Sequence, residues 1–171
     1  ELAFALNMTG FGAGVFMYVG LLALTMARHF LGAPVEGKMT PTLWVHLAPL
    51  SVIPLSMLAL LKTTGDASLL RYGSLVAAAF LGAALWWLVL AVSMTIRNRR
   101  QGKLPFALSW WAFVFPIGAC SVLAYRVSEL LALEVLPLVA SGLTLLALFV
   151  WSATALGTVR GLSLIHISEP T

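Results

Sequence analysis

Five long apolar segments constrain the fold of this chain more than any other feature. They cover residues 2–27, 41–61, 72–96, 109–131 and 135–159. Each segment exceeds the roughly 20 residues that an α-helix needs to cross about 30 Å of hydrocarbon. None of them shows the alternation of apolar and polar residues that marks a barrel strand. We therefore predict an all-α integral membrane protein with five transmembrane helices.

The composition agrees with a membrane environment. Hydrophobic residues make up 61% of the chain and charged residues 9%, against roughly 25% charged residues in an ordinary soluble domain. The chain opens with Glu1 and enters a full-length span at once, so we expect the first segment to be structural rather than a signal peptide. The single cysteine, Cys120, lies within an expected span, which excludes a disulfide framework and a thiolate metal site. We expect neither a metal nor a cofactor.

Both ends of the sequence indicate a partial domain. The chain begins at Glu1 without a methionine, as a piece of a longer reading frame would. The segment LSLIHISEPT, residues 162–171, breaks the helical pattern and is similar to the in-frame translation of a sequencing adapter. We expect residues 1–161 to be a partial domain and residues 162–171 to be foreign. The alternative is a short natural polar tail.

The basic residues predict the orientation in the membrane. The loop between the third and fourth spans holds a cluster of basic residues, and such clusters stay in the cytoplasm. Alternating sides then places the start of the chain outside the cytoplasm and its end inside. The cytoplasmic basic residues are Arg28, Lys38, Arg97, Arg99, Arg100, Lys103 and Arg160, and the outer ones are Lys62, Arg71 and Arg126. This bias explains the net charge of +4, so nucleic acid is not an expected partner, whereas the lipid bilayer is.

An internal repeat relates the second and fourth spans. TLWVHLAP begins at Thr42 and SWWAFVFP begins at Ser109, so the two stretches are offset by 67 residues. The offset pairs Thr42 with Ser109, Trp44 with Trp111, His46 with Phe113 and Pro49 with Pro116. The pattern predicts helix pairs in which one helix is bent by proline and the other is straight. Channels and transporters often contain such repeats, with their sites where interrupted helices meet.

The prolines free backbone carbonyl groups inside the membrane. Pro49 and Pro116 cannot donate to the carbonyls of Val45 and Ala112, and Pro54 cannot donate to Leu50, so we expect kinks at all three prolines. An unpaired carbonyl in lipid must find another helix, a hydroxyl or a water-filled cavity. The alternative is a packing kink without a pathway. The candidate pore-lining residues are Thr42, His46, Ser51, Gly118 and Ser121. For His46, a role as an interhelical hydrogen-bond donor is an equal alternative.

Two of these stretches resemble a known family. SWWAFVFPIGACSVLAYR resembles the ninth helix of the tellurite-resistance/C4-dicarboxylate transporter family, which includes the slow-type anion channels of plant guard cells. TPTLWVHLAPLS resembles the seventh helix of that family. The resemblance covers residues 2–161, as helices six to ten of ten. It implies tandem helical hairpins around a quasi-fivefold axis, with the proline-bent helices lining a central pore.

The resemblance also implies roles for particular residues. In the family, a phenylalanine before the mid-helix proline plugs the pore, and that residue is Phe115 here. Phe113 is a rival, because it matches His46 in the repeat and counting along the helix does not fix its face. Arg126 is implied at the outer mouth of the pore. Glu129 follows at i+3, so a surface ion pair between the two is the alternative.

The expected function is the passage of small anions. Asp, Glu and Lys are absent from the interior of every expected span, which disfavours cation channels and proton-driven pumps. We expect a channel or a C4-dicarboxylate (malate) transporter gated by phenylalanine, with chloride, nitrate, malate or sulfite as the anion. The alternatives are a sulfite exporter or a proton-coupled carrier of the same family. A membrane-embedded enzyme is a remote alternative, because only Cys120, His46 and scattered hydroxyls are available. The resemblance further implies a missing N-terminal half, a homotrimer and a bacterial inner or plasma membrane.

Overall fold

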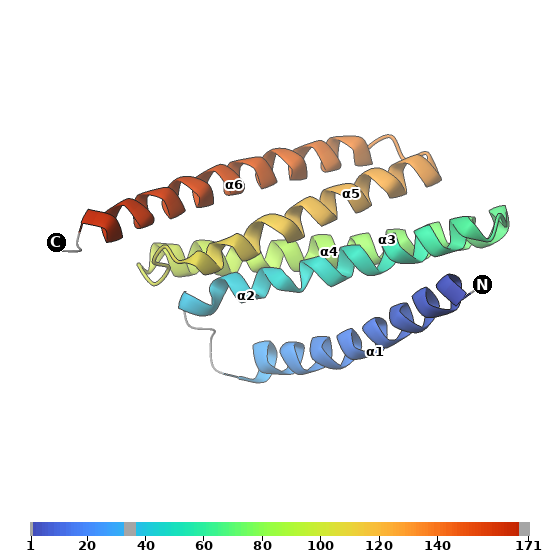
Figure 1. The fold of residues 1–171 in the computed structure, drawn as a ribbon, viewed down its shortest axis with the longest axis horizontal. Coiled ribbons are helices and arrows are strands. Elements are labelled where there is room, and N and C mark those ends of the chain that lie inside the picture. The colour runs from blue at the N-terminus through green and yellow to red at the C-terminus, as the bar shows by residue number, and fades with distance from the viewer. Residues whose placement is uncertain (1, 33–36, 168–171) are drawn as a thin grey trace.

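A computed structural model describes residues 2–32 and 37–167, and these residues form helices joined by short turns (Figure 1). The long helices lie side by side with roughly parallel axes, with α1 and α6 at opposite edges of the bundle. The elements are α1 (Leu2–Leu31), the 3₁₀ helix η1 (Gly37–Met39), α2 (Thr40–Val45), α3 (Leu47–Thr63), α4 (Ala67–Arg100), the 3₁₀ helix η2 (Leu108–Phe113), α5 (Val114–Leu131) and α6 (Leu136–Ile167).

The predicted transmembrane helices are confirmed. Over the described residues, five helical units are long and apolar enough to cross a membrane: Leu2–Leu31, Thr40–Thr63, Ala67–Arg100, Leu108–Leu131 and Leu136–Gly161. Some helices extend beyond the apolar segments. The start of α4 at Ala67, for example, is fixed by Asp66, whose carboxylate accepts the N–H groups of Ser68 and Leu69 as an N-cap.

The last helix continues further than the sequence pattern predicted. We expected the helical pattern to end at Gly161, but α6 runs through Ile167. The reason is compositional, because residues 162–167 are mostly apolar and contain neither glycine nor proline. Residues 168–171, which complete the segment expected to be foreign, lie outside the described residues.

The core lies among α3, α4 and α5, while α6 packs on α5 and α1 packs on α3. In α4 a stripe of mostly small residues faces this core, which lets the neighbouring backbones approach closely. The stripe consists of Gly73, Ala77, Leu81, Ala84, Trp87 and Ala91. In contrast, Tyr18 is the one buried residue of α1. The apolar side chains of α1 are therefore available to lipid or to further protein.

Candidate transport pathway

The second and fourth spans are both interrupted, at positions that the sequence repeat relates. In the second span α2 ends at Val45 and α3 begins at Leu47, so His46 lies between them. In the fourth span η2 ends at Phe113 and α5 begins at the next residue. His46 and Phe113 are the pair separated by the 67-residue offset. The two spans therefore share one construction, a short first segment followed by a longer α-helix.

The two paired prolines lie just after these interruptions. Pro49 is the third residue of α3, and Pro116 is the third residue of α5. The N–H groups in the first turn of a helix have no intrahelical acceptor, so proline at these positions removes no helical hydrogen bond. Pro54 is different, because α3 continues through it to Thr63. The interruptions therefore belong to Pro49 and Pro116 alone among the three predicted kink sites.

Side chains from neighbouring helices bind backbone carbonyls around the break in the second span. The Trp87 indole N–H donates to the carbonyl of Leu43 at 2.7 Å, and the Tyr18 hydroxyl donates to the carbonyl of His46 at 3.2 Å. We expected the freed carbonyl to be that of Val45. The hydrogen bonds from other helices instead reach the carbonyls of Leu43 and His46.

The His46 side chain belongs to an aromatic cluster rather than to an open surface. Its ring is half-buried and lies 6.1 Å from the Tyr18 ring and 5.1 Å from the Trp87 ring, measured between centroids. These contacts come from α1 and α4 on one side of the break. The structure thus packs the His46 ring against aromatic rings of α1 and α4, while its roles as a pore-lining residue and as an interhelical hydrogen-bond donor both stay predictions.

A groove runs along α5 between α3 and α6, and Phe115 lies in it. The groove has a volume of about 760 Å³. The Phe115 side chain is 64% exposed there, whereas Phe113 is 4% exposed and packs between Trp44 and Trp110. The two candidate gate residues therefore have opposite environments. The groove is lined by Val52, Leu55, Val114, Phe115, Gly118, Ala119, Ser121, Val122, Thr144, Ala147, Leu148 and Trp151.

Of the other candidate pore-lining residues, two line the groove and two do not. Gly118 and Ser121 line the groove, and the Ser121 hydroxyl bonds to the Ala140 carbonyl at 2.8 Å and to the Thr144 hydroxyl at 2.7 Å. Ser51 is fully buried and donates to the Leu47 carbonyl at 2.9 Å. Thr42 is exposed near the start of α2 and donates to the Met39 carbonyl. Ser51 and Thr42 do not line the groove. Ser51 faces the core from α3, and Thr42 lies in the first turn of α2.

A second cavity adjoins the groove at the opposite end of the bundle from the last turn of α4, which carries Arg97, Arg99 and Arg100. It has a volume of about 300 Å³ and is lined by Lys62 of α3 and Arg126 of α5, besides apolar residues. Leu55 lines both this cavity and the groove, so the two are neighbours. The Arg126 guanidinium pairs with the Glu129 carboxylate at 2.9 Å on the helix surface. The ion pair that the sequence offered as an alternative is therefore formed.

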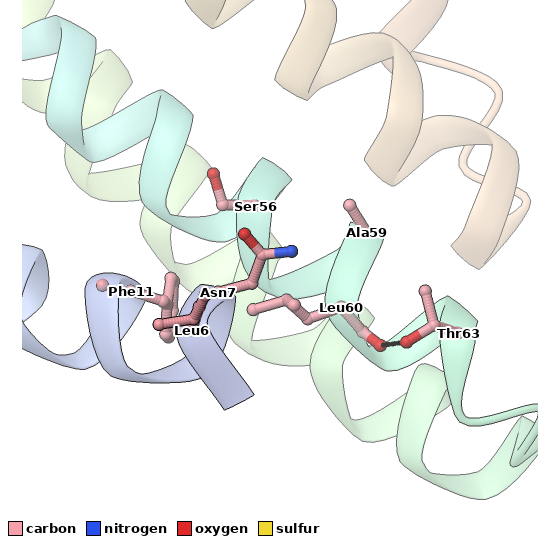
Figure 2. Close-up of a pocket in the computed structure, with 8 residues that line it drawn as sticks. Leu6, Asn7, Phe11, Ser56, Ala59, Leu60 and Thr63 are labelled. Atoms are coloured by element: carbon pink, nitrogen blue, oxygen red, sulfur yellow. Dashed lines mark hydrogen bonds between the residues drawn. The ribbon is translucent and has the colours of Figure 1, made fainter. Parts of the chain in front are cut away.

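The sequence reasoning missed Asn7, Thr144 and Trp151. Asn7 lines a cavity of about 490 Å³ between α1 and the last turns of α3, where Figure 2 shows it facing Ser56 and Leu60. An amide within an otherwise apolar span was the signal that could have found Asn7. Thr144 and Trp151 line the Phe115 groove from α6, and their spacing along an apolar helix carried no such signal. Among the residues that the structure describes, no three His, Cys, Asp or Glu side chains gather into a group that could hold a metal ion.

Comparison with known proteins gives one family. The family model named SLAC1, voltage-dependent anion channel, matches residues 3–159. Two uncharacterized transporters of Methanocaldococcus jannaschii are 31% and 32% identical to this chain over 160 residues, which is 94% of the chain. The chain spans about half the length of these curated relatives, 47% and 46% respectively. No solved structure matches it significantly.

These matches confirm the resemblance carried by the two proline motifs. The family and the names of the relatives belong to transport proteins rather than to enzymes. The five apolar helices agree with that assignment, because they require a bilayer. The chain is an integral membrane protein that belongs to the SLAC1 family of voltage-dependent anion channels.

Proposed function

We propose that this chain forms part of a pathway for small anions in which Phe115 is the gate. The observation that carries the proposal is the position of Phe115. Its ring is exposed on a groove, one residue before the proline of a helix that begins within the fourth apolar span, Leu108–Leu131. A large apolar ring at such a position blocks ions until it moves, because hydrophobic constrictions exclude water. Phe113 is buried against two tryptophans and is held in place.

The chemistry around the groove supports anions rather than cations. The side chains that line it are apolar apart from the hydroxyls of Ser121 and Thr144 and the indole N–H of Trp151, and carboxylates are absent from this lining. Lys62 and Arg126 line the adjoining cavity at one end. Such a surface attracts an anion at its entrance and holds it only weakly inside, which conduction requires. We assign Arg126, with Lys62, to the outer mouth of the pathway.

The pathway is completed by further helices in this proposal. The relatives are about twice as long as this chain, and the Phe115 groove has α3, α5 and α6 on its sides but is open on its remaining face. A second set of helices from the same protein would close it. The basic last turn of α4 and the loop after it would face the cytoplasm, and the start of α1 would face the opposite side. The exposed side chains of α1 would then meet lipid, the second set of helices or another subunit of a homotrimer.

Reconstitution of the full-length protein in planar bilayers tests the proposal. With chloride or nitrate at unequal concentrations on the two sides, we expect a current whose reversal potential follows the anion gradient. Malate and sulfite serve as further test ions, offered as uptake substrates to liposomes. Saturable uptake of malate or sulfite without a current would contradict a channel and indicate a carrier. Strict coupling of that uptake to protons would contradict the inference drawn from the absence of acidic residues in the interior of the expected spans.

A further inference from the structure

At the end of the bundle where α4 ends in Arg97, Arg99 and Arg100, a separate cavity lies among α2, α4, η2 and α6. Its volume is about 310 Å³. Aromatic and aliphatic side chains form nearly all of its wall, and one charged residue, Arg99 in the last turn of α4, lies on it. The wall consists of Trp44, Thr95, Arg99, Leu104, Trp110, Phe113, Phe149, Val150 and Ala153.

The polar side-chain groups of this wall, apart from Arg99, are already hydrogen-bonded within the protein. The Trp44 indole N–H donates to the Thr95 hydroxyl at 3.0 Å, and that hydroxyl donates to the Ala91 carbonyl at 2.7 Å. The Trp110 indole N–H donates to the Pro105 carbonyl at 3.1 Å. The arginine guanidinium has donors to spare and forms no ion pair with a carboxylate of the described residues. A ligand of this cavity must therefore be apolar along most of its length and carry an anionic group at Arg99.

The charges around the cavity favour the same ligand. Arg97, Arg99, Arg100 and Lys103 lie together at this end of α4 and just after it. The described carboxylates, those of Asp66, Glu129 and Glu134, lie in or near the turns at the other end of the bundle. On the side of α6, Phe149 is 72% exposed, so the cavity continues into a surface that lipid can reach. Basic pockets between transmembrane helices at the headgroup level are known to bind anionic lipid headgroups.

We propose that this cavity binds an anionic phospholipid, with its phosphate on Arg99 and its acyl chain along Phe149, Val150 and Ala153. The site shares three wall residues, Trp44, Trp110 and Phe113, with the interrupted spans. A lipid bound there packs against both interruptions at once. Because the lipid binds the folded protein and not the unfolded chain, its binding raises the unfolding temperature.

The test titrates the full-length protein in detergent micelles with phosphatidylglycerol and measures the unfolding temperature. We expect a saturable rise with phosphatidylglycerol and little change with phosphatidylcholine. Arg99→Gln should weaken the apparent affinity about tenfold, the size expected for losing a charge-assisted contact. The matched controls Arg97→Gln and Arg100→Gln lie in the same basic cluster but not on the cavity wall. They should keep the affinity within about twofold.

A second variant tests the apolar part of the site without changing its charge. Ala153→Trp fills the cavity beside α6 and should remove the rise in unfolding temperature that phosphatidylglycerol causes, measured against the same variant without lipid. Equal losses for the three arginine variants would overturn the proposal in favour of a general surface field. The same rise with inorganic phosphate alone would also overturn it, by assigning Arg99 to a free anion. An equal rise in unfolding temperature with phosphatidylcholine would overturn the proposal that the negative charge of the lipid is recognised by Arg99.

Discussion

The Trp44 indole meets the Phe113 ring edge-on, with the two ring centroids 5.2 Å apart. Both side chains are 4% exposed. Trp44 lies in α2, just before the interruption of the second span, and Phe113 ends η2 at the interruption of the fourth. The contact therefore joins the two interrupted spans directly. Movement at one break must be accommodated at the other.

This contact predicts an energetic coupling between the two residues. In a double-mutant cycle of Trp44→Ala and Phe113→Ala, we expect about 0.5–1.5 kcal/mol of coupling, the range for edge-to-face aromatic pairs. The measurement is the free energy of unfolding of the full-length protein in mixed micelles. Phe115→Ala is the matched control, because its ring lies in the groove, and it should combine additively with Trp44→Ala. Additivity of the Trp44 and Phe113 variants would contradict the coupling.

The hydrogen bond from Tyr18 to the His46 carbonyl predicts a second effect. Tyr18→Phe keeps the ring and removes the donor, leaving the carbonyl at the break without that partner. We expect a loss of about 0.5–2 kcal/mol in the free energy of unfolding, the range for interhelical hydrogen bonds in membranes. Tyr72→Phe is the control, since Tyr72 is 68% exposed at the other end of α4 from the basic cluster. Equal effects of the two substitutions would show that the hydrogen bond from Tyr18 to the His46 carbonyl does not stabilise the fold.

Asp66 predicts a pH dependence at the start of α4. Its carboxylate accepts hydrogen bonds from the Ser68 hydroxyl at 2.5 Å, from the Leu69 N–H at 3.2 Å and from the Ser68 N–H at 2.8 Å. These bonds lower the pKa of Asp66 below its ordinary value of 3.8. Because the pKa is lower in the folded state, the ionised carboxylate stabilises the folded protein above pH 3.8. The protein loses this stabilisation as the pH falls through the folded-state pKa.

Asp66→Asn keeps a capping side chain but does not titrate. We therefore expect the wild-type protein to lose its advantage over Asp66→Asn as the pH falls from neutral to below 3.8. Unfolding temperatures of both proteins between pH 7 and about pH 3 measure this difference. A constant difference over the whole range would show that the carboxylate charge does not contribute.

The sequence predicted the spans and the special character of the second and fourth for clear physical reasons. A bilayer demands long apolar helices, and proline predicted bends in 41–61 and 109–131, where the structure has a break just before Pro49 and Pro116 and none at Pro54. The face on which Phe115 lies was not predictable by counting. The residues before it form a 3₁₀ helix, whose tighter turn shifts every angle counted at the α-helical period. Tyr18 and Trp87 were not predictable as carbonyl partners either, because they are 28 and 44 residues away along the chain.

The role of Phe115 is tested most directly by the anion current of the full-length Phe115→Ala variant. Phe16→Ala, which removes an 81% exposed phenylalanine from α1, is the matched control. We predict that Phe115→Ala raises the chloride current about tenfold or more, since lowering a barrier by about 1.4 kcal/mol changes a rate tenfold. Phe16→Ala should leave the current unchanged. A Phe115→Ala current equal to that of the wild-type protein would contradict the gate.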